Sequence, residues 1–273
     1  MIQSDSHLHT YYSMDSATPV RDMIEGGISK GLKAIYFTDH YDEDYPTLHT
    51  APDYTQIFDC DAYFKEIQSL KEEYSGKIEV RIGIEFGLQP HLGEFFDDLA
   101  KKYPFEFIVG SLHVIDEDDP HEKRLFIGKR DEEIYRRMFE DTLLCIETTN
   151  DFDVLGHLDY VVRYGAEMEK NYSYGRFASI IDAILMALIE RGKGLEVNTS
   201  GFKYGLPFPH PTFDVIKRYR RLGGEIITVA SDGHSPDYIA YEFDKIPAIL
   251  EEAGFKYYTE FKERKPYFVK IEN

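Results

Sequence analysis

The first sixteen residues contain four side chains that can bind a metal ion. In SDSHLHTYYSMDS (residues 4–16), His7 and His9 stand two positions apart, and Asp5 and Asp15 flank them. Residues two apart on a β-strand point to the same side, so an H-x-H pair can share one ion. The alternative is a polar loop that happens to hold two histidines. A metal site requires further ligands from elsewhere in the chain.

The elements that must bring such ligands together alternate along the chain. We expect strands at residues 2–6, 33–38, 78–84, 105–110, 152–155, 194–198 and 225–230. We expect helices at 19–30, 59–74, 91–102, 130–149, 176–191, 211–222 and 236–253. A strand followed by a helix, seven times, predicts α/β architecture with parallel strands and right-handed crossovers. The units can close into a barrel or lie as an open doubly wound sheet, and the lack of an early glycine-rich phosphate loop favours the barrel.

Potential ligands follow every expected strand, and in both architectures the carboxyl ends of the strands form the functional face. In chain order they are His7, His9, Asp39, His40, Glu85, His113, His157, Glu196, Asn198, Asp232 and His234. A single histidine after a strand is more often a hydrogen-bonded residue than a ligand. Glu85, within IGIEFG, should be buried, and buried carboxylates are rare unless paired or metal-bound. Convergence of these groups on one rim predicts a multinuclear metal site.

Other polar residues near the rim have less direct roles. Asp15 lies in the first loop, where it either caps the following helix or reaches back to a metal, and we favour the metal. We expect Asp5, Asp39 and Asp159 to orient neighbouring imidazoles from outside the ligand set. The histidines expected to be solvated or helix-capping are His49, His91, His121 and His210. Of these, His210 in PFPHP could also line the pocket.

Composition limits the partners and the compartment. Residues 1–273 contain no linker or repeat, so we expect a single domain. A formal charge of -19 argues against a nucleic-acid partner but not against a small phosphorylated substrate, because bound cations reverse the local potential. Neither a signal peptide nor a membrane span is visible. Cys60 and Cys145 have no metal-type spacing and fit a reducing cytoplasm as free thiols.

Six motifs together resemble the PHP family, named for polymerase and histidinol phosphatase. They are D-x-H-x-H at 5–9, T-D-H at 38–40, the lone Glu85, S-L-H at 111–113, G-H-L-D at 156–159 and S-D-G-H at 231–234. The resemblance spans nearly the whole chain, and the segment G-H-L-D-Y-x-x-R-Y is similar to the family's stand-alone histidinol-phosphate phosphatases. It implies a distorted (β/α)7 barrel, with the site at the carboxyl ends of the strands.

The resemblance assigns nine residues to three divalent metal ions, with Glu85 shared between two of them. Ion by ion, they are His7, His9, Glu85 and Asp232; Glu85, His113 and His157; and Asp15, His40 and His234. Some family members have a histidine where Asp15 stands. Mixed histidine and carboxylate ligands suit zinc, iron or manganese. Amidohydrolase-like barrels also begin with H-x-H, but they commonly bridge two metals with a modified lysine, and the third strand here offers Glu85 instead.

The implied activity is metal-dependent hydrolysis of a phosphate monoester by an activated water, with L-histidinol phosphate of histidine biosynthesis as the expected substrate. Two alternatives remain at this point: a PHP phosphoesterase for another ester, such as a nucleotide or tyrosine phosphate, and a non-catalytic regulatory module. Retention of all nine ligands argues against lost catalysis. The sequence leaves the oligomeric state open.

Substrate contacts are harder to assign than metal ligands. Asp232 or His234 is the candidate proton donor to the leaving alkoxide. Arg163 is the candidate phosphate ligand, with a surface salt bridge as the alternative. Further candidates for contact with the substrate are Asn198, Ser200 and, for its amine, Glu117. The loop at 41–58 would act as a lid or pack as a surface loop.

Overall fold

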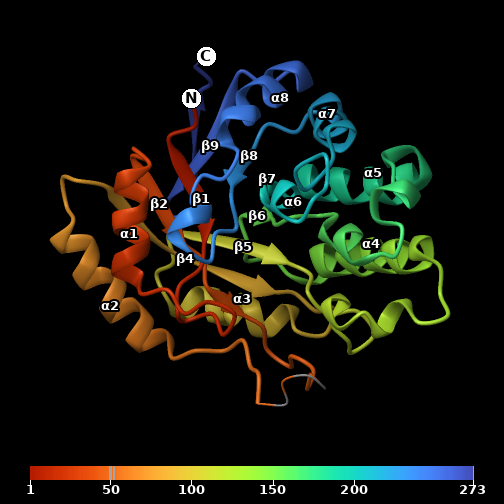
Figure 1. The fold of residues 1–273 in the computed structure, drawn as a ribbon, viewed down its shortest axis with the longest axis horizontal. Coiled ribbons are helices and arrows are strands. Elements are labelled where there is room, and N and C mark those ends of the chain that lie inside the picture. The colour runs from red at the N-terminus through yellow and green to blue at the C-terminus, as the bar shows by residue number, and fades with distance from the viewer. Residues whose placement is uncertain (49–50, 52, 273) are drawn as a thin grey trace.

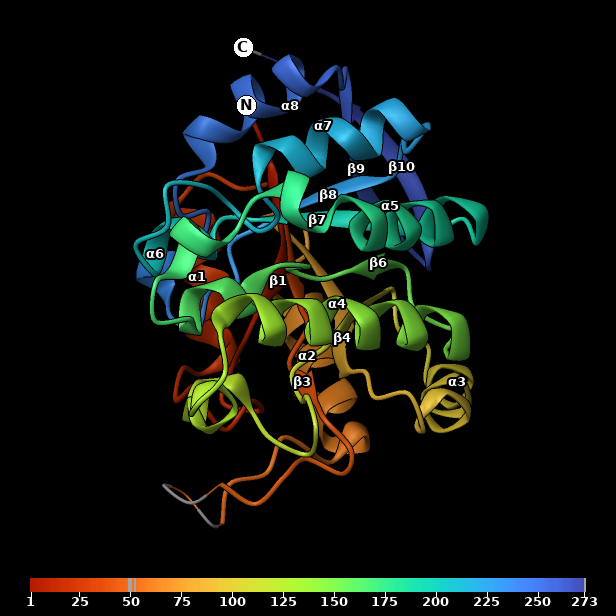
Figure 2. The same ribbon diagram turned by 90° about the vertical axis from the view of Figure 1, so that its right-hand side faces the viewer.

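The computed structural model describes residues 1–272 apart from residues 49, 50 and 52. Within them, seven parallel strands form a curved sheet with helices outside it (Figures 1 and 2). In spatial order they are β1 (Ser4–Leu8), β2 (Ala34–Phe37), β4 (Glu79–Gly87), β5 (Phe107–Ser111), β6 (Val154–Leu155), β7 (Gly194–Asn198) and β8 (Ile227–Ala230). A short strand, β3 (His40–Tyr41), pairs with the second half of β4.

The first and last strands of this sheet approach each other and nearly close the barrel. The backbone N–H of His9 donates to the carbonyl oxygen of Gly233 at 3.0 Å. The buried carboxylate of Asp5 accepts hydrogen bonds from the Ser231 N–H (3.0 Å) and hydroxyl (2.5 Å) and from the Ala240 N–H (2.8 Å). The predicted distorted (β/α)7 barrel is therefore confirmed, and an open sheet is excluded. The expectation that Asp5 orients an imidazole is wrong, because its carboxylate fastens the end of β8 to β1.

Seven helices of the described chain follow the seven barrel strands, as the strand–helix alternation predicts. They are α1 (Val20–Ser29), α2 (Cys60–Glu73), α3 (Gly93–Lys102), α4 (Asp131–Thr148), α5 (Tyr174–Glu190), α7 (Phe213–Leu222) and α8 (Ile246–Ala253). Each turns an apolar stripe to the sheet; on α5 the buried residues are Phe177, Ile181, Ile184, Leu185 and Leu188. None of the described helices is long and apolar enough to cross a membrane.

Shorter turns fill the connections at the carboxyl ends of the strands. They are the short helix α6 (Ser200–Lys203) and 3₁₀ turns at Pro120–Glu122, Arg124–Phe126, Tyr160–Tyr164, Met168–Asn171, Pro236–Tyr238 and Phe243–Lys245. The helix expected at 236–253 is correct only in its second half. Ala240 and Glu242 have positive φ angles, and the Ala240 N–H is bonded to Asp5 instead of to a helical carbonyl.

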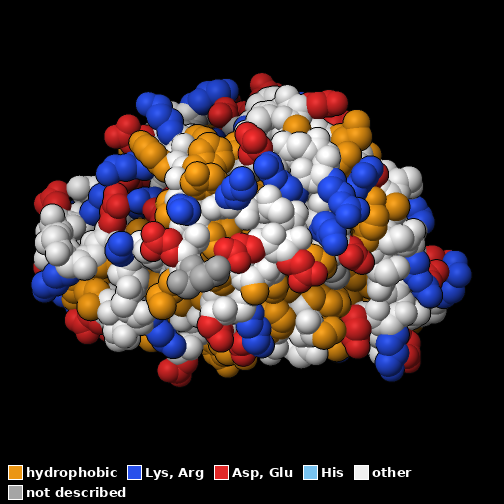
Figure 3. All heavy atoms as spheres, turned by 90° about the horizontal axis from the view of Figure 1, so that it is seen from above, with side chains coloured by type: hydrophobic (Ala, Val, Ile, Leu, Met, Phe, Trp, Pro, Cys, Tyr) orange, Lys and Arg blue, Asp and Glu red, His pale blue; other side chains and the backbone are white. Residues whose placement is uncertain are grey.

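A C-terminal hairpin, absent from the predicted elements, covers the amino end of the barrel. Strands β9 (Tyr257–Lys262) and β10 (Lys265–Lys270) pair antiparallel, and the two residues between them have positive φ angles of 51° and 61°. Phe261 of β9 packs in one buried cluster with residues from the first halves of β2 and β5. The turn residues are Glu-Arg instead of the usual Asn-Gly, so the hairpin signal in the sequence is weak. Over the face near the chain ends, acidic and basic side chains intermingle (Figure 3).

Candidate active site

Glu85 lies at the centre of a buried group of histidines at the carboxyl end of the barrel. Its Oε2 atom is 3.1 Å from Nε2 of His7 and 2.7 Å from Nδ1 of His40. Its Oε1 atom is 2.9 Å from Nε2 of His157 and 3.3 Å from Nε2 of His113. These histidines come from four different strand ends, and the Glu85 side chain is fully buried. One carboxylate therefore joins residues that lie up to 150 positions apart in the sequence.

A second part of the cluster lies beside Glu85 and is more open to the cavity. Oδ1 of Asp232 is 3.2 Å from Nε2 of His9, and the rings of His9 and His234 stack at 4.1 Å between centroids. Oδ2 of Asp15 is 3.1 Å from Nε2 of His234 and 3.6 Å from Nε2 of His40. Asp15 therefore reaches back to the rim instead of capping α1. All nine residues assigned to metals in the sequence lie in this cluster.

The donor atoms of the cluster fit cations. Four buried atoms have no hydrogen-bond partner among the described residues: Nε2 of His7, Nε2 of His9, Nδ1 of His40 and Oε2 of Glu85. Several of these atoms are close to one another, but their orientation does not allow a hydrogen bond. Because buried polar atoms normally have a partner, bound cations would account for these four. Sets with ligand atoms within 4.8 Å of one another are His7, His9 and Glu85; Glu85, His113 and His157; His9, His40 and His234; and His40, Asp42 and His113.

Carboxylates outside this group fix the orientation of two imidazoles. Oε1 of Glu196 is 2.7 Å from Nδ1 of His7, and Oδ1 of Asp42 is 2.7 Å from Nδ1 of His113. Each contact holds the proton on Nδ1 and leaves Nε2 free to bind an ion. Glu196 also accepts the backbone N–H of His157 at 2.9 Å. The sequence pointed to Glu196 only as one polar strand-end residue among several, and Asp42 was missed because it lies beyond the T-D-H motif.

The two aspartates expected to orient His40 and His157 have different partners. The Ser13 hydroxyl donates a hydrogen bond to Asp39 at 2.8 Å, and the same Ser13 oxygen is 3.0 Å from Nδ1 of His9. Asp39 thus supports an imidazole of the cluster, but through Ser13. Asp159 is 2.7 Å from Nδ1 of His210. The expectation that Asp159 orients His157 is wrong, and His210 is a fully buried residue outside the described cavity lining.

The charges of the cluster depend on each other. Burial raises the pKa of Glu85, but the positive charges of His7, His40 and His113 outweigh burial and hold the pKa well below its ordinary value. Burial lowers the pKa of His9, and the neighbouring rings of His234 and His40 lower it further. The low pKa keeps Glu85 anionic, and the lowered pKa of His9 favours its neutral imidazole; both are forms that bind metal ions. Burial lowers the pKa values of His7, His40 and His113, but nearby carboxylates outweigh burial and raise them, so a cation must displace protons at these three rings.

A cavity of about 420 Å³ opens beside the cluster. Its lining includes six of the nine cluster residues, Asp15, His40, His113, His157, Asp232 and His234. The rest comes from loops and short turns, including the expected lid at 41–58, which contributes Asp42, Tyr45, Leu48, Ala51, Tyr54 and Gln56. That loop therefore forms a wall of the cavity, and residues 49, 50 and 52, among them His49, lie outside the described residues. A cavity of this size accommodates a small-molecule substrate.

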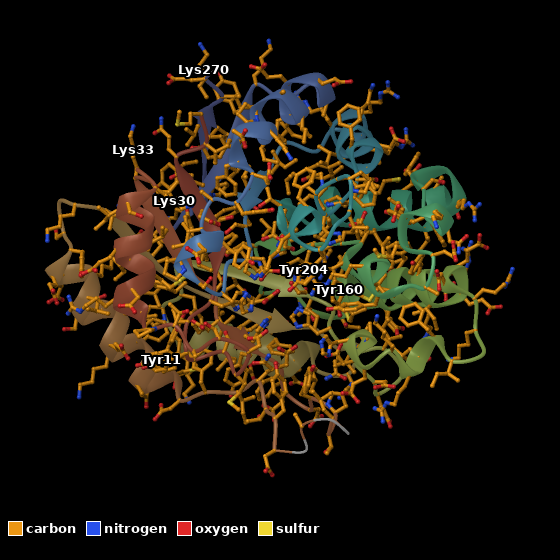
Figure 4. The ribbon with its side chains drawn as sticks, viewed as in Figure 1. Tyr11, Lys30, Lys33, Tyr160, Tyr204 and Lys270 are labelled. Carbon is orange, nitrogen blue, oxygen red and sulfur yellow. The ribbon has the colours of Figure 1, made fainter. Side chains whose placement is uncertain are left out.

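Arg163 lines the cavity against aromatic rings. Its guanidinium carbon is 4.0 Å from the ring centroid of Tyr204 and 5.1 Å from that of Tyr160, two residues that lie near each other at the centre of Figure 4. Its Nη2 atom donates to the Tyr164 hydroxyl at 2.7 Å, while Nε and Nη1 are buried without a partner among the described residues. None of the described carboxylates forms an ion pair with Arg163, so the salt-bridge alternative is wrong.

Lys203 and Tyr204, also in the cavity lining, were missed in the sequence. They follow the VNTSG segment at the end of β7, and the position after a strand end was their only signal. Burial lowers the pKa of Lys203, while the charge of Asp232 raises it. Lys203 thus places a second positive charge near Arg163, which itself lowers the Lys203 pKa.

Three expected substrate contacts lie elsewhere. The amide of Asn198 donates to Glu196 at 3.0 Å, and its oxygen accepts the Ser200 N–H at 3.0 Å. Both residues are buried below the cavity surface. Glu117 is exposed and lines a separate hollow with Asp44 and His91, so it does not reach the cavity. In contrast, His121, expected to be solvated or capping, is exposed but lines the cavity.

The PHP domain family model matches residues 5–200. The chain belongs to the PHP family. A probable histidinol-phosphatase of Clostridium acetobutylicum is 29% identical over 92% of this chain and 94% of its own length. A histidinol-phosphatase of Lactococcus lactis is also 29% identical, over 93% of each chain. The crystal structure of L. lactis histidinol phosphate phosphatase, complexed with zinc, L-histidinol and phosphate, matches this PHP chain with a TM-score of 0.87 and 28% identity, covering 97% of this chain and 98% of that one.

Proposed function

We propose that this PHP protein hydrolyses L-histidinol phosphate to L-histidinol and phosphate with the help of three divalent metal ions. The observation that carries the proposal is one cavity with two kinds of wall. Nine candidate metal ligands meet on one side, six of them in the cavity lining, and the cations Arg163 and Lys203 lie in the same lining. Full-length similarity to proteins named histidinol-phosphatase, and to one complexed with L-histidinol and phosphate, supports this choice of substrate.

The proposed ligand sets keep the sequence assignment. Two of the close sets, His7 with His9 and Glu85, and Glu85 with His113 and His157, support it, and the contacts of Asp15 support the third ion. Ion by ion, they are His7, His9, Glu85 and Asp232; Glu85, His113 and His157; and Asp15, His40 and His234. Asp42 orients His113 in this scheme. The zinc in the L. lactis complex and the mixed ligands favour zinc, and iron or manganese also suit these donors.

Bound at these residues, divalent ions would lower the pKa of a water molecule and neutralise charge on the phosphoryl oxygens. The protein's own groups then position the ester. The unpartnered Nε and Nη1 of Arg163 donate to phosphate oxygens, and the stacked Tyr204 ring holds the guanidinium in place. The ammonium of Lys203 adds a second positive charge. Asp232 or His234, both in the cavity lining, supplies the proton to the leaving alkoxide.

The whole chain, residues 1–273, serves in this proposal as one catalytic domain in a reducing cytoplasm. Both cysteines, Cys60 and Cys145, are buried free thiols, and burial raises their pKa values, so neither is activated for chemistry.

The test is phosphate release from L-histidinol phosphate and from a panel of nucleotide, tyrosine and sugar phosphates, with elemental analysis of the same preparation. We expect the highest kcat/KM with L-histidinol phosphate, two or three metal ions per chain, and loss of activity after chelation that zinc, iron or manganese restores. Far faster hydrolysis of another ester would refute the substrate. Fewer than two metals in fully loaded protein would refute the multinuclear centre.

A further inference from the structure

We propose that Asp119 binds the ammonium group of the substrate and so selects an amino-alcohol phosphate over uncharged phosphate esters. The inference rests on the proposed phosphatase function and deepens it by assigning the residue that binds the positive charge of the substrate. It replaces Glu117, the residue expected from the sequence.

Asp119 differs from the other carboxylates of the cavity. The described lining contains four, Asp15, Asp42, Asp119 and Asp232. Asp15, Asp42 and Asp232 each lie within 3.2 Å of a cluster imidazole, at His234, His113 and His9 respectively. No lysine, arginine or histidine among the described residues forms an ion pair with Asp119. Its negative charge is therefore available to a ligand.

Neutral donors hold the Asp119 carboxylate in position. The Tyr45 hydroxyl donates to Oδ2, and the backbone N–H of His121 donates to Oδ1 at 2.7 Å. The second contact caps the 3₁₀ turn Pro120–Glu122. Each carboxylate oxygen can accept a further hydrogen bond, so the group is fixed but not saturated. An ammonium group, with three donors, matches such an acceptor.

Tyrosine rings lie near Asp119 in the cavity lining. The rings of Tyr45 and Tyr54 lie 5.5 Å apart, and both line the cavity with Tyr160 and Tyr164. Asp119 interacts electrostatically with Tyr45, Tyr160 and Tyr164. Tyr160 and Tyr164 already lie against the Arg163 guanidinium. Ring faces attract cations, so Tyr45 and Tyr54 favour the same ligand charge as the carboxylate.

The cavity lining thus carries charges of both signs on either side of Tyr160 and Tyr164. Arg163 and Lys203 both interact with Asp232 of the metal cluster and suit the phosphate. Asp119, with Tyr45 and Tyr54, suits a positive charge. A ligand with a phosphate at one end and an ammonium at the other satisfies both, whereas an uncharged ester leaves Asp119 desolvated without a partner.

The experiment compares two substrates and two matched variants. The substrates are L-histidinol phosphate and its analogue without the amino group, 3-(imidazol-4-yl)propyl phosphate. The variant Asp119→Asn keeps an oxygen for the His121 N–H and removes the charge. Glu117→Gln removes one negative charge from an exposed site two residues away. The readout is the ratio of kcat/KM for the amine-bearing ester to that for the amine-free ester.

For the wild type we expect this ratio to be about 10–100, the range for a charge-assisted hydrogen bond. In Asp119→Asn we expect the ratio to fall to about 1–3. Once the carboxylate is gone, removing the amine from the substrate has little further effect, because the two groups are partners in one contact. Glu117→Gln should keep the wild-type ratio. Tyr45→Phe removes the hydroxyl that donates to Oδ2 of Asp119 but keeps the Asp119 charge, so it should lower the ratio about threefold. This variant replaces Asp119→Asn in the test if Asp119→Asn does not fold.

The outcomes separate this inference from the function on which it rests. A wild-type ratio retained in both Asp119→Asn and Tyr45→Phe overturns the role of Asp119 and leaves the phosphatase function intact. An equal fall in Glu117→Gln also overturns it, because the effect would then come from overall charge. If the wild type instead prefers an unrelated phosphate ester, the proposed function itself fails.

Discussion

The two walls of the cavity differ in how the chain builds them. The metal wall consists of side chains at strand ends, together with Asp15 from the first loop. The sheet register fixes the spacing of the strand-end residues; His40 of β3, for example, pairs directly with Glu85 of β4. The loop wall consists of half-buried side chains such as Tyr45, Asp119 and Arg163, placed by turns of irregular geometry. The barrel thus determines the chemistry, and the loops determine which ester reaches it. Mutations on the two walls should therefore have different signatures.

The largest effect is expected on the metal wall, at Glu85. Glu85→Gln removes the charge that faces four histidines, so we expect a loss of bound metal and a fall in kcat of more than about 1,000-fold, or about 4 kcal/mol of barrier. Elemental analysis and steady-state kinetics check this result. Glu117→Gln, which removes a carboxylate of the same type from an exposed position, is the control. Normal metal content in Glu85→Gln would mean that this residue is not the shared ligand.

On the loop wall, Arg163→Ala should raise KM about 100-fold, since a charge-assisted contact to phosphate contributes roughly 1.5–3 kcal/mol. Metal content should not change. Arg163→Lys should recover only part of the loss, because an ammonium cannot donate through two parallel N–H groups. Arg136→Ala, an exposed arginine on α4, is the matched control. Loss of metal in Arg163→Ala would break the distinction between the walls.

A residue behind the metal wall tests whether orientation matters as much as ligation. Glu196→Gln weakens the contact to Nδ1 of His7, and we expect metal affinity to fall about 10–100-fold. Competition with a chelator of known affinity measures the change. Excess metal should restore most of the activity, and a change in KM without a change in metal affinity would contradict this role.

The smallest expected effect is at Lys203 on the loop wall. Its ammonium is half-buried over the Tyr238 ring and forms no ion pair among the described residues, so Lys203→Ala should raise KM only about 3–10-fold, with a smaller difference at high salt. Kinetics at two ionic strengths check this. An effect larger than that of Arg163→Ala would reverse their ranking as phosphate ligands.

The sequence contains enough information to predict the barrel and the metal wall. Parallel strands place their carboxyl ends on one rim whatever the loops do, so the histidines and carboxylates after seven strands were expected to meet there. Their order along the chain also resembles the PHP family. The helix expected at 176–191 could also be predicted, because the three- and four-residue spacing of its apolar residues is visible in the sequence alone.

The contacts made by loops could not be predicted from the sequence. Glu117 and Asp119 are alike in type and two positions apart, yet only Asp119 faces the cavity, because the turn that follows it fixes its carboxylate. Asp5 and Asp159 have the expected position beside a histidine, but their partners, Ala240 and His210, lie more than 50 residues away. Such pairings depend on backbone paths that sequence spacing does not encode.

The closure of β1 against β8 has a consequence for the order of events during synthesis. His7 and His9 leave the ribosome first, but Asp232 and His234, which complete the cluster, follow more than 220 residues later. A nascent or truncated chain that ends before β8 lacks the Asp5–Ser231 contact. It also lacks one ligand from each of two proposed ion sites, Asp232 from one and His234 from the other. Full loading of the proposed metal sites therefore requires β8 and accompanies closure of the barrel, so that ions bound there would add directly to the stability of the closed fold.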